Sequence, residues 1–186
     1  GILLICAVLA CIGLNLTSQV DSFGMALLAL TVYAVGKTFF WPTMLAVASD
    51  RFPRTGAVAI SMMGGIGMMS AGLIGSPGLG YLKDRFAGEA LQETSPELFA
   101  EYKAEKPSEF IGFPPATGLD GKKLGAVQEK LTEARKAAEE SGEAEPLAAM
   151  DRLSEDEQAV NAASIEGDSR TLVADTAIPV AVAVIY

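Results

Sequence analysis

The chain is 186 residues long, half of its residues are hydrophobic (50%), and its formal net charge at pH 7 is −9. It contains no histidine, and its two cysteines, Cys6 and Cys11, match neither a Cys-x-x-Cys redox pair nor a zinc site. No nucleophile is paired with a base, so we expect no enzyme, no catalytic residue, no metal and no cofactor. The acidity argues against nucleic acid as a partner, because phosphate binding needs clustered lysines and arginines.

The charge is divided unevenly along the chain. The segment from Asp84 to Arg170 holds 20 of the 23 acidic residues and 10 of the 14 basic residues, a net charge of −10. The rest of the chain has a net charge of +1 and contains these charged residues: Lys37, Arg51, Arg54, Lys83, Asp21, Asp50 and Asp175. The acidity therefore belongs to one segment, and apolar sequence lies on both sides of it.

Two long apolar runs predict membrane-spanning helices. Residues 57–82 contain no charged side chain, and residues 22–49 contain only Lys37. At a rise of about 1.5 Å per residue, a helix over 57–82 is about 39 Å long, which exceeds the roughly 30 Å hydrocarbon core of a bilayer. A buried helix of a soluble protein is the alternative, but such a helix usually carries a polar stripe. We therefore expect the lipid bilayer to be a partner of the chain.

The expected fold class is all-α, a fragment of a polytopic transmembrane helix bundle. Residues 1–85 are predicted to form three transmembrane helices in an antiparallel series, over about 1–17, 22–49 and 57–83. A fourth transmembrane helix is predicted to start within residues 171–186. Because the first and last apolar segments break off while still hydrophobic, we expect the first and last helices to be incomplete and the chain to belong to a longer protein.

The acidic segment, residues 86–170, is expected to be a soluble, partly helical insert. Ser95 is a preferred N-cap residue, and it predicts a helix that reaches about Lys103. A second helix, which Gly142 ends, is predicted by apolar residues at helical spacing: Leu124, Val127, Leu131, Ala134 and Ala138.

A capping box of Ser154 and Glu157 predicts a third helix of the insert near residues 155–163. Three short amphipathic helices bury little surface, and acidic segments with few aromatic residues tend to be solvated. The composition therefore favours a solvated spacer. The alternative is an insert that docks on the membrane-spanning part.

Lys37 is the candidate substrate-binding residue. It lies near the middle of the second predicted span, where a cation costs about 2.5–3.5 kcal/mol, so such a residue tends to face a bundle interior or a water-filled cavity. Tyr33, Phe40 and Trp41 share its helix face. One cation in an aromatic wall suits a polar, anionic small-molecule solute held near the midplane. The alternative is that Lys37 pairs with an acid on a missing helix and only stabilises the bundle.

Two further features suit helices that move. Pro42 predicts a kink in the helix that carries Lys37, because it removes a backbone hydrogen bond. Gly67, Ala71 and Gly75 repeat at the spacing that lets helices approach closely. Both features also occur for plain packing reasons.

Three stretches carry a family resemblance. Residues 36–44 read G-K-T-F-F-W-P-T-M, residues 49–56 read S-D-R-F-P-R-T-G, and residues 75–86 read G-S-P-G-L-G-Y-L-K-D-R-F. Over these residues the chain resembles the major facilitator superfamily of secondary transporters, in the C-terminal part that covers about helices nine to twelve, with a long insert before the last helix. The last stretch also resembles the family's G-x-L-x-D-R loop signature without its basic continuation, so the side that the insert faces stays open.

The resemblance implies that Tyr33, Lys37, Phe40 and Trp41 line a central cavity, because the tenth helix of that family does so. We therefore expect secondary active or facilitated transmembrane transport of a solute by alternating access, driven by a coupling proton or ion or by the solute's own gradient. The expected location is the plasma (inner) membrane, as an integral membrane protein. The alternative function is a membrane-anchored sensor or interaction protein that acts through the acidic insert.

Overall fold

A computed structural model describes residues 1–20, 22–140 and 149–185. The regular elements among these residues are helices, which confirms the all-α class for the described part of the chain. The chain divides into two compact units. Residues Gly1–Pro77 with Ser169–Tyr186 form the first, here named the apolar unit, and residues Gly78–Asp168 form the second, here named the acidic unit.

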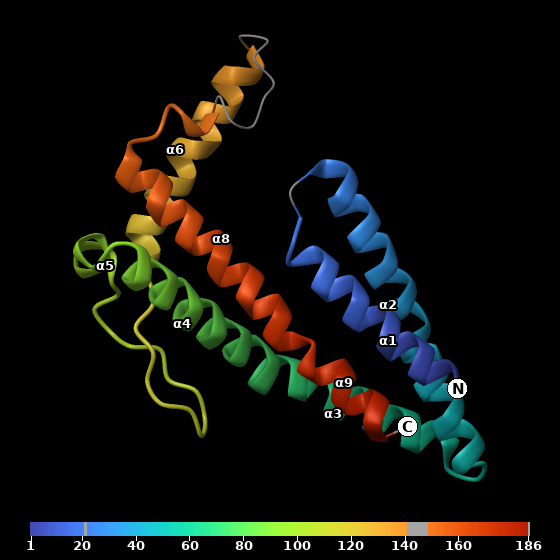
Figure 1. The fold of residues 1–186 in the computed structure, drawn as a ribbon. Coiled ribbons are helices and arrows are strands. Elements are labelled where there is room, and N and C mark those ends of the chain that lie inside the picture. The colour runs from blue at the N-terminus through green and yellow to red at the C-terminus, as the bar shows by residue number, and fades with distance from the viewer. Residues whose placement is uncertain (21, 141–148, 186) are drawn as a thin grey trace. The chain divides into compact units, whose positions relative to one another are not determined.

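The apolar unit is built from four helices, a π-helical turn and the last residues of a longer helix (Figure 1): α1 (Ile2–Thr17), α2 (Phe23–Arg51), α3 (Gly56–Ser70), η1 (Ala71–Gly75), α9 (Ala177–Ile185) and the end of α8 (Glu155–Asp175). α1 and α2 pack as an antiparallel pair, α9 packs on α1, and α3 returns beside the last turns of α2. Ser22 caps α2, because its hydroxyl accepts a hydrogen bond from the Met25 amide at 3.3 Å.

The third predicted helix is longer than the sequence suggested. α3, η1 and α4 (Ser76–Thr94) follow one another without a break, so the helix does not end near Lys83. Pro77 is tolerated because it follows η1, where the backbone pairing already departs from the regular α-helical pattern. Charged residues beyond Leu82 are good helix formers, and they carry the helix on to Thr94.

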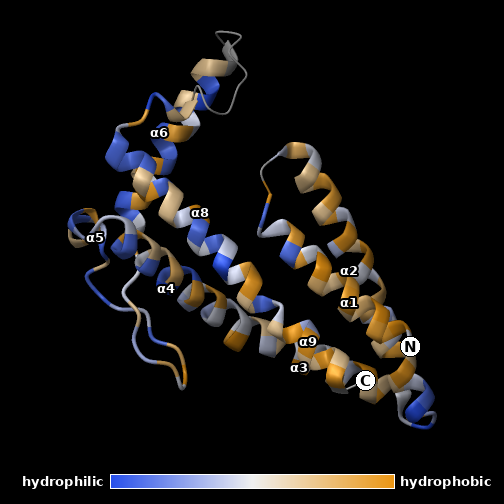
Figure 2. Cartoon of the chain, viewed as in Figure 1, coloured by the Kyte–Doolittle hydropathy of each residue, from blue (hydrophilic) through white to orange (hydrophobic). Residues whose placement is uncertain are grey.

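Two helices of the chain, Phe23–Arg51 and Gly56–Thr94, are long and apolar enough to cross a membrane. Few residues in the apolar stretch of the first are buried in the protein, and none in that of the second. Figure 2 shows the hydropathy of the helices: α1, α2 and α3 are mostly apolar, and α6 and α8 are largely polar. The core helix of a soluble protein is mostly buried, so this exposure favours a membrane as the surroundings of both helices.

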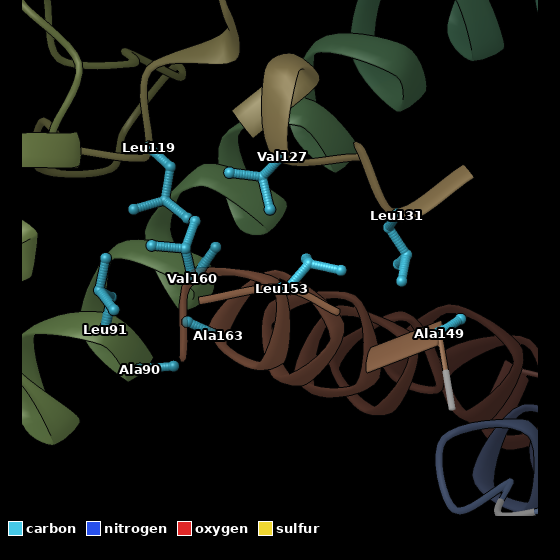
Figure 3. Packing of buried hydrophobic residues seen from close by; sticks show 10 residues of the cluster. Ala90, Leu91, Leu119, Val127, Leu131, Ala149, Leu153, Val160 and Ala163 are labelled. Carbon is cyan, nitrogen blue, oxygen red and sulfur yellow. The ribbon is translucent and has the colours of Figure 1, made fainter. Parts of the chain in front are cut away.

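The acidic unit consists of α4 from Gly78 onward, α5 (Pro96–Tyr102), α6 (Gly121–Glu140) and α8 up to Asp168. Its core is a single cluster of buried apolar side chains (Figure 3), contributed by three helices and the segments beside them: Ala87, Ala90, Leu91, Leu119, Val127, Leu131, Ala149, Leu153, Val160 and Ala163. The apolar face predicted for α6 is confirmed, since Val127, Leu131 and Ala138 are buried. Gly142, the predicted stop of this helix, lies outside the described residues.

The helix starts predicted in the insert are confirmed. The Ser95 hydroxyl accepts a hydrogen bond from the Leu98 amide at 3.5 Å at the start of α5. At the start of α8, the Glu157 amide donates to the Ser154 hydroxyl at 3.3 Å, and the Ser154 amide donates to the Glu157 carboxylate at 3.1 Å. These reciprocal bonds form the predicted capping box.

The acidic segment is more compact than a set of three short helices would be. α4 and α8 belong to the core as well, and they approach closely through small residues: a Cβ added at Gly167 would lie 2.6 Å from the Ala87 nitrogen. α8 also runs to Asp175, well past the end predicted near residue 163. Longer helices and contacts between small residues bury more surface than three short helices do, which is why the segment forms a compact unit.

Candidate functional site

Two glycines bring α1 and α2 of the apolar unit into backbone contact. A Cβ added at Gly13 would lie 2.6 Å from the backbone nitrogen and Cα of Tyr33, and one added at Gly36 would lie 2.9 Å from the Cys6 carbonyl oxygen. A larger residue at either position would push the helices apart. Because Tyr33 and Lys37 are one helical turn apart, these contacts fix the backbone from which both side chains project.

The end of α8 and the whole of α9 return antiparallel beside α1. The Ser169 hydroxyl donates a hydrogen bond to the Ser18 carbonyl, and the Cys11 thiol lies 4.0 Å from the Thr176 carbonyl oxygen, within the range of a weak S–H···O contact. The residue numbers rise along α8 and α9 as they fall along α1, so the two segments run in opposite directions. These contacts give the apolar unit a third wall beside α1 and α2.

The helix is interrupted at Thr176, between α8 and α9. Pro179 has no N–H, so it cannot donate to the Asp175 carbonyl as a continuous helix would require. Instead, the Thr176 amide and hydroxyl donate to the Val173 carbonyl, at 3.1 and 2.6 Å. The break leaves Asp175 at the very end of α8, where its side chain faces the space beside α1 and α2.

A cavity of about 360 Å³ lies between these walls. Its lining is mainly aliphatic and aromatic, with one basic and one acidic side chain, and consists of Ala10, Leu14, Tyr33, Lys37, Phe40, Trp41, Asp175, Ile178, Pro179 and Val182. The volume is within the range of small-molecule sites, and an apolar lining with a few polar groups is typical of such sites.

All four residues predicted from the sequence as the substrate site therefore line one cavity. The Lys37 ammonium lies 5.6 Å from the centroid of the Tyr33 ring, a cation–π distance. Trp41 also reaches α3, because a Cβ added at Gly67 would lie 3.6 Å from its indole ring. The predicted aromatic wall and its cation are thus brought together in space, and Trp41 connects the wall to a further helix.

Asp175 is the member of this cavity that the sequence analysis did not single out. The sequence did contain a signal for Asp175, the same one that identified Lys37: a charged side chain within an apolar segment. The described residues contain no ion pair between Lys37 and Asp175, although both line the same cavity. Lys37 therefore shares its cavity with an acidic residue of this chain, at the end of α8. The alternative drawn from the sequence placed such an acid on a missing helix.

The stripe of small residues predicted on α3 meets little within the chain. Within the predicted repeat, a Cβ added at Gly67 would lie 3.6 Å from the Trp41 ring, and one added at Gly75 would lie 3.8 Å from the Ser70 carbonyl oxygen of the same continuous helix. The stripe lies along a helix with no buried residue. As for Pro42, α2 continues through it as one helix.

The acidic unit contains a separate cavity of about 370 Å³, formed by α4, α6 and α8. At its edge Lys83 and Asp168 form an ion pair at 2.9 Å, and both side chains are about half exposed. No group of three or more His, Cys, Asp or Glu side chains within the described ranges is arranged to hold a metal ion. The lining of this cavity combines charged and polar side chains with Ala87, Leu119 and Leu124, whereas the lining of the first is mainly aliphatic and aromatic.

Comparison of the chain with protein-family models, with curated proteins and with solved structures gives no match in any of the three.

Proposed function

We propose that this chain is part of an integral membrane transporter of the major facilitator type, which moves a small polar solute by alternating access. The observation that supports this most is the cavity of the apolar unit, where three helical segments bring one cation, one anion and an aromatic wall together. One of the two helices that are long and apolar enough to cross a membrane, Phe23–Arg51, carries four of the lining residues of this cavity. The proposed location is the plasma (inner) membrane.

In this proposal Lys37 binds an anionic group of the solute, while Tyr33, Phe40 and Trp41 hold its apolar part. Asp175 balances the lysine charge when the cavity is empty, and it is the group on which a coupling proton or ion would act in the secondary active form. The break at Thr176 suits this role, because interrupted helices commonly form the binding sites of transporters. Transport down the solute's own gradient needs only the binding roles of Lys37 and of the three aromatic residues.

The test is access of water to position 37. Lys37→Cys is introduced into the full-length protein in a Cys6→Ala, Cys11→Ala background, and a membrane-impermeant maleimide is applied to intact cells and to inverted vesicles. We expect labelling from at least one side, because an alternating-access cavity opens to water. Val35→Cys, on the opposite and exposed face of α2, is the matched control and should stay unlabelled. Complete protection of position 37 from both sides would contradict the proposal.

A second candidate function is a membrane-anchored sensor or interaction protein that acts through the acidic unit. It is favoured by the independent core of that unit and by its own cavity. Uptake of a panel of radiolabelled organic anions into proteoliposomes separates the two functions. Uptake that falls at least tenfold in Lys37→Ala and survives in Leu91→Asp, which disrupts the acidic core, supports transport. Absence of uptake of the whole panel by the unmodified protein supports the sensor.

A further inference from the structure

Residues 103–120, between α5 and α6 of the acidic unit, double back as a hairpin with an apolar tip. Backbone bridges pair Lys103 with Leu119 and Ser108 with Ala116, and Gly112 turns the chain with a φ of 82°. Next to it, Ile111 is 86% exposed and Phe113 is 52% exposed. Single exposed apolar side chains are common, but residues 111–115 are all exposed and uncharged, and a contiguous apolar patch of this kind marks a surface that meets an apolar partner.

The hairpin lies along α4 in a defined direction. Near its base, the Ser108 hydroxyl donates to the Asp84 carboxylate. Nearer its tip, the Tyr81 hydroxyl donates to the Pro114 carbonyl at 2.8 Å. A Cβ added at Gly78 would lie 3.1 Å from the Phe110 ring. The base therefore lies beside Asp84 and the tip beside Gly78, so the tip points toward the N-terminal end of α4.

An aromatic cluster fixes the tip on the helix. The Tyr81 ring centroid lies 6.0 Å from that of Phe110 and 5.7 Å from that of Phe113, and these two phenylalanine centroids are 5.8 Å apart. Tyr81 itself is buried. Ile111 is thus presented from a tip whose neighbours are held in place.

The cluster lies at the level where the apolar run of the helix gives way to charge. Residues 57–82 are uncharged, and Lys83 is the first charged residue after them. If the Gly56–Thr94 helix crosses a bilayer, it leaves the hydrocarbon near Tyr81. Tyrosine and tryptophan are enriched at that depth, because each combines an apolar ring with a polar O–H or N–H group, and phenylalanine adds apolar surface beside them.

We propose that the tip of this hairpin, Phe110–Phe113, is a membrane-interface anchor that inserts Ile111 and Phe113 into the lipid beside Tyr81, where the apolar run of the Gly56–Thr94 helix ends. The stretch from Phe110 to Leu119 carries no charge, which suits lipid contact. Glu109 immediately precedes it and is exposed, so the insertion is limited to the interface. The anchor fixes the acidic unit against the bilayer surface. This inference requires the membrane placement of the helix and is independent of transport.

The experiment measures contact with lipid directly. Ile111→Cys, in the full-length protein lacking Cys6 and Cys11, is labelled with an environment-sensitive NBD fluorophore and reconstituted into phosphatidylcholine vesicles. Nitroxide-labelled lipid and aqueous iodide then serve as quenchers. Glu129→Cys, exposed on α6, is the matched aqueous control, and Met68→Cys, exposed on α3, reports whether the helix itself is in lipid.

We expect nitroxide lipid to quench the probe at position 111 at least twofold more than the probe at position 129, and iodide to show the reverse order. Strong lipid quenching at 68 without any at 111 would overturn the anchor and leave the membrane placement standing. A probe at 111 that neither quencher reaches would indicate a protein contact at the tip, such as a second copy, and would also overturn the anchor. Absence of lipid quenching at both 68 and 111 would overturn the anchor together with the membrane placement.

Discussion

The apolar unit and the acidic unit use apolar side chains in opposite ways. No residue of α3 is buried in the protein, and its large side chains Met62, Ile66 and Met68 are exposed. In α6, by contrast, Val127 and Leu131 are buried, while the charged side chains from Lys122 to Lys136 are exposed. Both helices are regular, so they differ in whether their apolar side chains are exposed, as in α3, or buried against the protein, as in α6.

The comparison shows that the burial of its apolar side chains indicates the environment of a helix better than its apolar content does. An amphipathic helix such as α6 covers its one apolar face with protein and leaves the other face to water. A helix that is apolar on every side cannot be covered by one neighbour, and its exposed surface favours apolar surroundings such as lipid or further helices. The predictions below test this contrast, in order of decreasing effect.

The largest effect is expected for Leu91→Ala in the core of the acidic unit. Leu91 is fully buried in the main cluster, and truncation of such a leucine costs about 2–5 kcal/mol of unfolding free energy, because it leaves a cavity. Hydrogen exchange read by mass spectrometry should show faster exchange across residues 78–168. Leu73→Ala, at an exposed position, is the control and should leave exchange in both units unchanged. Equal effects of the two changes would break the contrast between the units.

A smaller loss is expected for Gly13→Ala at the contact between α1 and α2. The added Cβ meets the Tyr33 backbone at 2.6 Å, so the helices have to separate, and such overpacking costs about 1–3 kcal/mol. Trp41 is the single tryptophan of the chain, and its fluorescence reports thermal unfolding of the apolar unit in detergent. Gly24→Ala, where an added Cβ meets no atom within 4 Å, is the control. A midpoint for Gly13→Ala as high as that of Gly24→Ala would argue against close packing of the pair.

The sequence predicted the parts of the structure that depend on local chemistry. The caps at Ser95 and Ser154 were recognisable because a hydroxyl before a helix has one favoured partner. Lys37 and its aromatic neighbours were recognisable because a charge inside an apolar run is costly. Each of these features depends on residues that lie close together in the sequence, so the sequence alone is enough to predict it.

The parts that the sequence did not predict depend on contacts between distant segments. Asp175 joins the cavity because Pro179 interrupts the helix and α9 packs on α1. The core of the acidic unit was underestimated because alanines such as Ala87 and Ala163 give a weak periodic signal, although they allow close packing. Neither contact is encoded by the spacing of residues along one helix.

Tyr81→Phe should loosen the hairpin without unfolding the acidic unit. It removes the hydrogen bond from Tyr81 to the Pro114 carbonyl, which contributes about 0.5–1.5 kcal/mol. The amides of Ser108 and Ala116, which bond to each other's carbonyls at 2.8 and 3.0 Å, should exchange about two- to tenfold faster by NMR. Tyr102→Phe, which removes a hydroxyl elsewhere in the unit, should leave both amides unchanged. Unchanged exchange in Tyr81→Phe would mean that the rings alone hold the hairpin.

The smallest effect concerns the ion pair of Lys130 and Glu157, which joins α6 to α8. The pair, together with the Ser154 cap, lowers the pKa of the Glu157 carboxyl, and the hydrogen bond that Lys130 donates to Glu157 raises the pKa of the Lys130 ammonium. A lowered carboxyl pKa stabilises the fold above the ordinary value of about 4.5, and this contribution is lost as pH falls through the lowered pKa. A raised ammonium pKa stabilises it below about 10.5, and this contribution is lost as pH rises through the raised pKa.

Lys130→Gln should therefore weaken the acidic unit slightly at pH 7 and flatten the fall of its unfolding free energy below pH 4.5, as measured by urea unfolding followed by hydrogen exchange. The effect stays small because both side chains reach the solvent, where ion pairs contribute little. Lys136→Gln makes the same change of charge on the same helix at an exposed position, and it should leave the slope unaltered. If the two variants show the same pH dependence, the ion pair contributes nothing measurable, and the core around Val127 and Leu131 alone holds α6 to α8.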